Sequence, residues 1–232
     1  MTNGDNAGWR QCWRDRQADF HQESVNPLLA RFWSDLDLAP GSRVFVPLCG
    51  KSLDMIWLAR QGHEVIGVEL SPIAVRSFFR ENGLKPVRRQ VGKFVLWQSG
   101  KLRILCGDYF SLTAADLGQV DAVYDRAALT ALAEDSRSRY VGHLKTIVPG
   151  ACLVLLLTVE DAEAGETLDH SRAIASEVTA LYSEAFDFDL IHVESVYATD
   201  PHSTDQLPQR SEHKVYRLRT KSVNPGMQTA EG

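Results

Sequence analysis

The sequence lacks the features of a membrane-spanning or disulfide-stabilised protein. Its longest apolar run, Ala151 to Leu157, is far shorter than the roughly 18–20 residues needed to cross a bilayer. No signal peptide is indicated, because no apolar segment follows the N-terminal charges. The four cysteines form no CxxC pair, unlike disulfide scaffolds and zinc sites; they are Cys12, Cys49, Cys106 and Cys152. We therefore expect a cytoplasmic protein with no membrane partner and no metal site.

The chain also lacks an excess of positive charge. Its formal net charge is −5 and its sequence pI is about 5.8. A nucleic-acid partner is not expected, because binding to phosphates requires a basic surface. No repeat or linker divides the 232 residues, of which 44% are hydrophobic. We expect one monomeric domain over residues 1–220 and a disordered tail over residues 221–232.

Strand-like and helix-like stretches alternate along most of the chain. The expected strands cover residues 43–48, 64–70, 94–97, 102–106, 122–124, 152–159, 190–196 and 214–218. The expected helices cover residues 26–36, 53–61, 71–82, 137–148 and 171–186. This alternation predicts an α/β, Rossmann-like fold with a mostly parallel sheet and helices on both faces. The last two strands, with no helix between them, predict an antiparallel hairpin at one edge, which favours the methyltransferase variant of this fold.

The loop after the first strand contains little glycine. It reads Pro47-Leu48-Cys49-Gly50-Lys51-Ser52, without the GxGxxG of dinucleotide loops or the GxxxxGK[ST] of triphosphate loops. A nicotinamide-dependent oxidoreductase and a nucleoside triphosphatase are therefore disfavoured. A turn at this place can still present backbone N–H groups to a ligand, with Leu48 beneath its apolar part.

Acidic residues follow two of the expected strands. Glu69 lies 19 residues after Gly50 at the end of the second strand, where a carboxylate can receive ribose hydroxyls. Asp108, next to Tyr109, follows another strand, where the pair could meet an adenine amino group and stack on its ring. Each of these residues could instead be an ordinary strand-end or turn residue.

Arg126 ends the strand that covers residues 122–124, in the middle of the expected cleft. An arginine there can bind a carboxylate or stabilise a substrate anion. The alternative is a structural pair between Asp125 and Arg126.

Four short stretches together strongly resemble the thiopurine S-methyltransferase family. They are Trp13 with Phe20-His21-Gln22, "VPLCGKS" at 46–52, "GVELS" at 67–71 and "YDRAAL" at 124–129. The similarity runs from about Trp9 to Val159 and returns around residues 214–216. It implies a class I methyltransferase with a seven-stranded sheet and an N-terminal helical lid over residues 9–36, which uses S-adenosylmethionine and releases S-adenosylhomocysteine.

The resemblance also implies site residues. Those on the cofactor side are Trp13, Leu48, Gly50, Glu69, Asp108, Tyr109 and Arg126. Phe20 would face the substrate from the lid, and Arg126 would also serve catalysis by favouring the thiolate. The implied activity is direct in-line S-methylation of small aromatic or heterocyclic thiols such as thiopurines. Such thiols ionise readily, so no strong general base is required, and Cys49 is interpreted as packing.

The resemblance is incomplete on the acceptor side. Residues 161–170 lack the Gly-Pro-Pro-Phe stretch that the family usually carries there. Arg210 lies where a second substrate-side arginine often occurs, and its role is left open. Alternative acceptors are selenium or tellurium species or an endogenous thiol metabolite. A non-catalytic sensor that binds S-adenosylmethionine is the alternative outside the enzymes.

Overall fold

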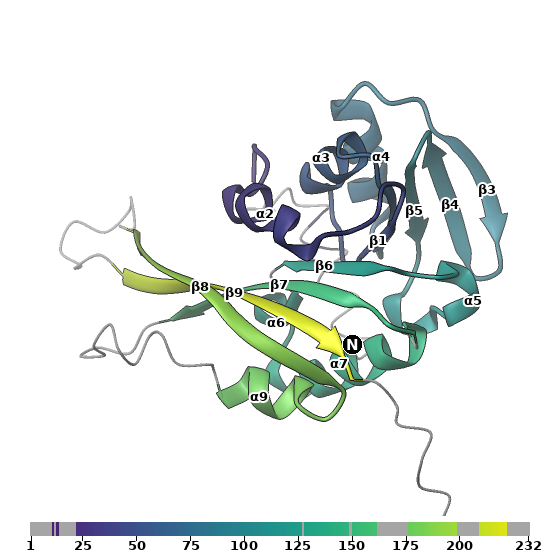
Figure 1. The fold of residues 1–232 in the computed structure, drawn as a ribbon. Coiled ribbons are helices and arrows are strands. Elements are labelled where there is room, and N and C mark those ends of the chain that lie inside the picture. Colours follow the sequence, from purple (N-terminus) through teal and green to yellow (C-terminus); the bar gives the residue numbers. More distant parts are fainter. Residues whose placement is uncertain are drawn as a thin grey trace, which may run out of the picture.

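The computed structural model of the chain describes residues 11, 13, 22–126, 128–148, 150–161, 176–198 and 209–221. These residues form one nine-stranded sheet with helices on both faces (Figure 1). The strands are β1 Arg43–Val46, β2 Glu64–Glu69, β3 Val87–Val91, β4 Phe94–Ser99, β5 Leu102–Cys106, β6 Ala122–Arg126, β7 Leu153–Asp161, β8 Phe186–Ala198 and β9 Gln209–Thr220. The predicted α/β fold class is confirmed.

The strand order is β3-β4-β5-β2-β1-β6-β7-β9-β8. The five central strands, from β5 to β7, run parallel to one another, and the pairs at both edges are antiparallel. The chain moves from β1 to β2 and β5 on one side, and then crosses to β6 on the other side of β1. The carboxyl ends of β1 and β6 therefore flank the point where the strand order reverses, which is where ligands bind in open α/β sheets.

The described residues form nine strands, compared with the seven expected for the fold and the eight ranges indicated by the sequence, and the strand without a predicted range is β3 at one edge of the sheet. The predicted hairpin around Gly100 is present as β4 and β5. Strand β3 was missed because its sequence, VRRQV, is exposed at four of its five positions and shows no clear apolar alternation. The five central strands are parallel to one another and the four outer strands pair antiparallel with their neighbours, so the sheet is mixed rather than mostly parallel.

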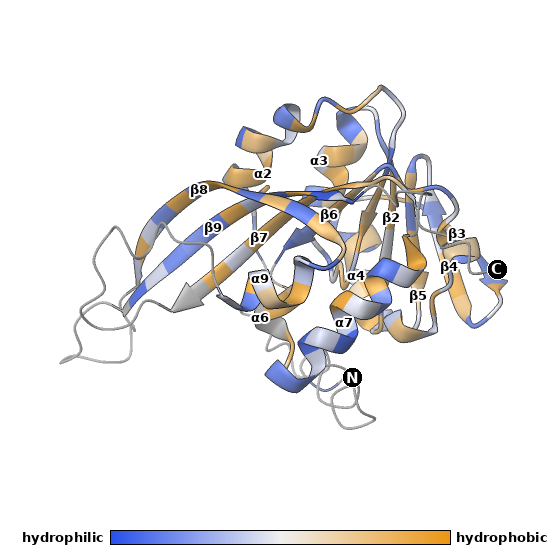
Figure 2. Ribbon diagram, turned by 60° about the horizontal axis from the view of Figure 1, so that its bottom comes forward, coloured by the Kyte–Doolittle hydropathy of each residue, from blue (hydrophilic) through white to orange (hydrophobic). Residues whose placement is uncertain are grey.

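The helices divide between the two faces of the sheet. They are α2 Pro27–Phe32, α3 Asp54–Arg60, α4 Pro72–Glu81, α5 Ala114–Leu117, α6 Ala128–Ala131, α7 Glu134–Ile147 and α9 Ser176–Tyr182, with 3-10 turns η1 Trp33–Leu36 and η2 Tyr109–Ser111. The first three pack with Val44 and Val46 in one buried cluster. Helices α5, α6, α7 and α9 pack with Phe45 and Val123 in the other. Figures 1 and 2 show α2 and α3 on one face of the sheet and α6, α7 and α9 on the other. None of the helices within the described ranges combines the length and apolar character needed to cross a membrane.

Local signals explain two helix starts. The side chain of Asn26 accepts the N–H of Leu28 at 2.9 Å, and that of Ser71 accepts the N–H of Ala74 at 3.4 Å. A proline follows each cap at the first helical position, where its missing N–H has no cost. Both helix starts were predicted from these residues, and both are confirmed.

The C-terminal part differs from the prediction in two places. The helix expected to reach residue 186 ends at Tyr182, because Phe186 is buried and begins β8. Lys221 was expected in a disordered tail, but its N–H donates to the carbonyl of Ala185 at 2.9 Å and its Nζ to that of Ser183 at 2.6 Å. The tail residues 222–232 lie outside the described residues. The predicted antiparallel edge hairpin is confirmed as β8 and β9.

Candidate functional site

The loop after β1 has an unusual backbone conformation. Leu48 and Gly50 have φ angles of 46° and 52°, in the left-handed region that side chains other than glycine rarely occupy. The N–H of Cys49 donates to the carbonyl of Val68 at 3.0 Å, so the end of β2 holds the loop in place. A left-handed leucine beside a ligand-binding crevice is the kind of local strain that functional sites retain.

Gly50 lies directly beneath the indole of Trp13. A Cβ atom on Gly50 would come within 3.3 Å of Cζ2 of Trp13, and the indole is buried. The single glycine of this loop is therefore needed for its positive φ and for close packing of the N-terminal segment. The structure thus brings together three of the predicted residues, Trp13, Leu48 and Gly50.

Glu69 joins this loop to the start of α4. Its Oε2 accepts the N–H of Gly50 at 3.0 Å and its Oε1 accepts the N–H of Ser71 at 2.6 Å. Each carboxylate oxygen has a second lone pair, so two further donors, such as a ribose diol, can be accommodated. Burial raises the pKa of Glu69 to about 7, although the N–H groups of Ser71 and Gly50 lower it.

Asp108 lies beside Glu69 at the same edge of the sheet. Glu69 is paired with Cys106, and the N–H of Gly107 donates to the carbonyl of Glu69 at 2.9 Å. Asp108 caps the turn η2 by accepting the N–H of Phe110 at 3.1 Å. A carboxylate at this position is compatible with the predicted contact to an adenine amino group.

Tyr109 is placed differently from the prediction that its ring stacks on adenine. Its side chain is 2% exposed, and its hydroxyl donates to the carbonyl of Tyr140 at 3.1 Å. The ring is therefore part of the core between the sheet and α7, and any contact with a cofactor would come from its backbone. The neighbouring ring, Phe110, is only partly buried and lies 4.1 Å below the guanidinium of Arg139.

Arg126 ends β6 next to the loop after β1. Phe45 in β1 is paired with Val123 in β6. Leu48 and Arg126 each lie three residues after this pair, so they are close to each other at the carboxyl ends of the two strands. The Nε of Arg126 lies 3.3 Å from Oδ2 of Asp54, the first residue of α3. Asp54 was not singled out in the sequence, because only the tertiary structure reveals that this helix-start carboxylate is buried and points at Arg126.

The alternative pair between Asp125 and Arg126 is not formed. Asp125 is completely buried, and its Oδ2 accepts the hydroxyl of Tyr140 at 2.7 Å. Burial raises the pKa of Asp125 to about 6, while the Tyr140 hydroxyl lowers it. Successive residues of a strand point to opposite faces, so Asp125 is directed toward α7 and Arg126 toward α3.

Arg210 is not brought next to Arg126. Its Nε and Nη2 lie 2.7 Å and 2.6 Å from Oε1 of the buried Glu212. Arg126 is paired with Leu157, which is paired with Val215. Arg210 is five residues from Val215 in β9, and this odd spacing puts the two arginines on opposite faces. Its role toward the acceptor stays a prediction, and Phe20 lies outside the described residues.

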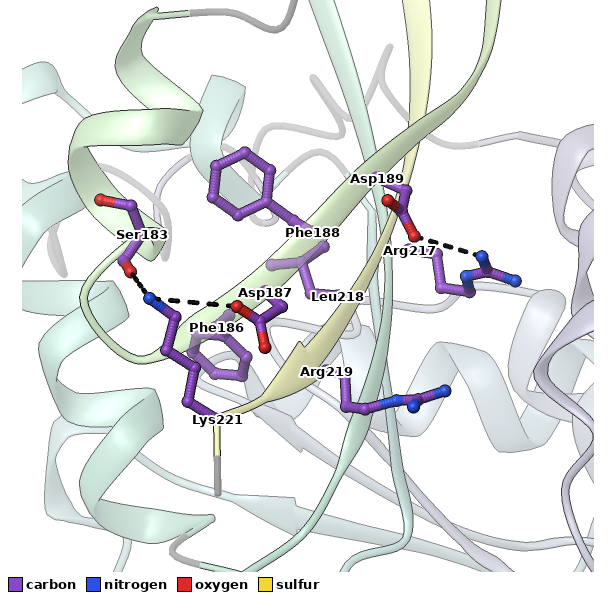
Figure 3. Close-up of a pocket in the computed structure, with 9 residues that line it drawn as sticks. All are labelled: Ser183, Phe186, Asp187, Phe188, Asp189, Arg217, Leu218, Arg219 and Lys221. Carbon is purple, nitrogen blue, oxygen red and sulfur yellow. Dashed lines mark hydrogen bonds and ion pairs between the residues drawn. The ribbon is translucent and has the colours of Figure 1, made fainter. Parts of the chain in front are cut away.

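A groove of about 570 Å³ lies at the other end of the sheet (Figure 3). Its residues include Leu218 and Arg219, which are paired with the first residues of β7, far along the strands from Arg126. It carries the pairs Lys221–Asp187 at 4.0 Å and Arg217–Asp189 at 3.2 Å. None of the predicted site residues lines this groove, and the candidate site is the group of residues at the carboxyl ends of β1, β2, β5 and β6.

Comparisons with known proteins show the family of the chain. A family model described as thiopurine S-methyltransferase matches residues 4–221 of the chain. A protein named thiopurine S-methyltransferase from Stutzerimonas stutzeri is 56% identical over 232 residues, which is 100% of this chain and 97% of that protein. Another of the same name, from Nitrosospira multiformis, is 43% identical over 216 residues, which is 93% of this chain and 98% of that protein.

Solved structures with little sequence identity share the fold. An S-adenosylmethionine-dependent methyltransferase from Anabaena variabilis has a TM-score of 0.58 at 12% identity and covers 93% of this chain and 95% of its own. The magnesium protoporphyrin IX methyltransferase from Synechocystis, solved with bound S-adenosylmethionine, has a TM-score of 0.57 at 14% identity and covers 94% of this chain and 97% of its own. The fold is thus that of S-adenosylmethionine-dependent methyltransferases.

Proposed function

This chain belongs to the thiopurine S-methyltransferase family, and on that premise we propose that it methylates small aromatic or heterocyclic thiols, such as thiopurines, with S-adenosylmethionine. The observation that carries the proposal is the arrangement around Glu69. A buried carboxylate holds a glycine-poor loop through one oxygen and the start of α4 through the other, and keeps a lone pair on each for ribose. Such a site recognises a nucleoside without needing a phosphate cradle.

The residues present fit this cofactor. Glu69 would accept the ribose hydroxyls, and Asp108 would accept the adenine amino group. Leu48 and Gly50 would line the path of the methionine part, and Trp13 would cover it. Gly50 has no side chain and adopts a left-handed conformation, so its backbone can lie close to the ligand. When bound, S-adenosylmethionine supplies a methyl group made electrophilic by a sulfonium.

Arg126 is the proposed acceptor-side residue. It is 20% exposed at the end of β6, and so its guanidinium can be reached from the crevice. It would donate hydrogen bonds to the acceptor and favour the thiolate form over the thiol. Holding the sulfur in line with the methyl group supplies the larger part of the catalysis, since orientation alone can be worth several kcal/mol.

The N-terminal segment is the proposed cover of the site. Trp13 already packs against Gly50, and we assign Phe20, seven residues further along, to stacking on the acceptor. Together they would exclude water from the reacting atoms. A site closed in this way would take a small-molecule acceptor. The enzyme would act as a monomer with no nucleic-acid partner.

A methyltransferase assay tests the proposal. 6-Mercaptopurine, thiophenol and selenite are each supplied with S-adenosylmethionine, and the methylated product and S-adenosylhomocysteine are quantified. The proposal expects turnover of the thiols, with kcat/KM reduced at least tenfold in Arg126→Ala and Phe20→Ala. Arg76→Ala, at an exposed position on α4, is the matched control and should behave as the wild type.

No turnover of any thiol would overturn the proposed function. Binding of S-adenosylmethionine without turnover would favour a sensor, and turnover of selenite alone would favour the metalloid alternative.

A further inference from the structure

Asp54 is the point where three parts of the chain meet. Its Oδ1 accepts the backbone N–H of Asn26 at 2.8 Å, and its Oδ2 accepts the hydroxyl of Tyr124 at 2.8 Å. The same Oδ2 lies 3.3 Å from Nε of Arg126. Asp54 is 1% exposed, whereas Arg126 is 20% exposed, so the carboxylate is a fixed buried anchor and the guanidinium reaches out from it.

The position of this contact determines which part of Arg126 remains available. A guanidinium has five N–H groups, and Nε lies on the edge nearest the protein. Within the described ranges, the contact with Asp54 is the one salt bridge that the guanidinium forms. Nε is the nitrogen that lies next to Asp54, and the two terminal nitrogens, Nη1 and Nη2, form the planar fork at the far end of the side chain.

We propose that Asp54 is a positioning residue that aims this fork at the acceptor, and that the fork selects thiols with a ring nitrogen next to the carbon that bears sulfur. This inference rests on the proposed function and names its substrate class. In an ionised N–C–S unit, which has lost its proton to solvent, the nitrogen and the sulfur accept hydrogen bonds from one edge and in one plane, which matches two parallel N–H donors. A thiophenolate offers sulfur alone to the fork.

The opposite charges of Asp54 and Arg126 favour selection of the acceptor by hydrogen-bond geometry rather than by charge. The carboxylate of Asp54 offsets the charge of Arg126, so an acceptor gains more from the directed hydrogen bonds than from net attraction. In the transfer the thiol proton passes to solvent, and a sulfur lone pair forms the new bond to the methyl carbon. The electrons of the broken sulfonium bond remain on the departing sulfur, which becomes a neutral thioether.

Two isomeric acceptors test the proposal. 2-Mercaptopyridine carries the ring nitrogen next to the C–S carbon, whereas 4-mercaptopyridine carries it on the opposite side of the ring. The ratio of their kcat/KM values is measured in the wild type and in Asp54→Asn, so that intrinsic reactivity cancels between proteins. We expect the ratio to fall about tenfold in Asp54→Asn, equivalent to one charge-assisted hydrogen bond. The Kd for S-adenosylmethionine should stay unchanged.

Tyr140→Phe is the control for loss of stability. It removes a buried hydroxyl from the neighbouring carboxylate, Asp125, on the other face of the sheet. Its ratio should equal that of the wild type even though the protein is less stable. If it lowers the ratio as much as Asp54→Asn does, the effect comes from destabilisation and the proposal is wrong.

Two further variants keep the test decisive if Asp54→Asn does not fold. Asp54→Glu retains the charge but displaces the guanidinium by one methylene, and Arg126→Lys replaces the fork by a single ammonium; both should lower the ratio. An unchanged ratio in the variants of Asp54 and Arg126 that fold overturns the inference and leaves thiol methylation intact. Absence of turnover with both isomers and with 6-mercaptopurine refutes the proposed function itself.

Discussion

Replacing Glu69 by glutamine should weaken binding of S-adenosylmethionine in a pH-dependent way. The carboxylate accepts N–H groups from Gly50 and Ser71 and keeps one lone pair per oxygen for the ligand. A glutamine has one carbonyl oxygen, and its NH2 group would face one of these N–H donors and one ribose hydroxyl. Loss of at least one charge-assisted hydrogen bond, about 1.5–3 kcal/mol, raises the Kd roughly 10- to 150-fold.

The pH dependence follows from the raised pKa of Glu69. Burial puts this pKa at about 7 in the free protein, and hydroxyl donors bind best to the ionised form. The Kd of the wild type should therefore fall by about tenfold between pH 6 and pH 8 through this group, and level off above pH 8. The amino group of the ligand and Asp125 titrate in both proteins, so the difference between wild type and Glu69→Gln isolates Glu69.

The free energy of unfolding of the ligand-free protein should fall as the pH rises, whereas the affinity for S-adenosylmethionine should increase. The folded state holds a proton on Glu69 up to about pH 7, whereas the unfolded chain releases it near the ordinary glutamate pKa of 4.5. Between these pH values the folded state binds more protons, so the contribution of Glu69 to stability is present below pH 4.5 and is lost as the pH rises through 7. The loss is roughly 3 kcal/mol, and Glu69→Gln should lack it.

Isothermal titration calorimetry at several pH values measures the Kd, and urea denaturation measures the free energy of unfolding. Glu64→Gln, at the other end of β2, is the matched control and should bind as the wild type does. If Glu69→Gln shows the same Kd and the same pH curve as the wild type, the assignment of Glu69 to ribose is wrong.

Two further predictions concern packing around the site. Gly50→Ala should lower the melting temperature and raise the Kd for S-adenosylmethionine, because it adds left-handed strain of about 1–2 kcal/mol and a contact with Trp13. Gly92→Ala has the same strain, at φ 53°, but open space around it, so equal melting temperatures for both variants would contradict the role of the Trp13 contact. Tyr140→Phe should lower the free energy of unfolding at pH 8 by about 1–3 kcal/mol, since it removes the donor to Asp125. The loss should be smaller at pH 5, where Asp125, with its pKa raised to about 6, is protonated in the folded state; urea denaturation giving equal losses at both pH values would contradict this.

Features with local causes could be predicted from the sequence. Asn26 and Ser71, each followed by proline, indicated their helix starts, and the apolar runs indicated the central strands. The position of Glu69 beside the loop of Gly50 could be predicted because its distance from Gly50 along the chain reflects one strand–helix–strand unit. The resemblance to the family then connected these separate signals to a single cofactor.

Features with long-range causes could not be predicted. The contact between Tyr124 and Asp54 joins residues 70 positions apart, and no pattern near Asp54 indicates it. Tyr109 resembles a stacking residue in the sequence, yet its hydroxyl finds a carbonyl on α7, which draws the ring into the core. Arg210 resembles a substrate-side arginine, but its partner Glu212 becomes evident only when β9 is formed and the carboxylate is buried.

The most direct test of the account follows the methyl group. S-Adenosylmethionine with an isotopically labelled methyl is incubated with the protein and 6-mercaptopurine, and both products are quantified by mass spectrometry. The account expects labelled S-methyl product and S-adenosylhomocysteine in equal amounts, at a rate that falls at least tenfold in Arg126→Ala. Release of S-adenosylhomocysteine without labelled thioether, or an unchanged rate in Arg126→Ala, would contradict it.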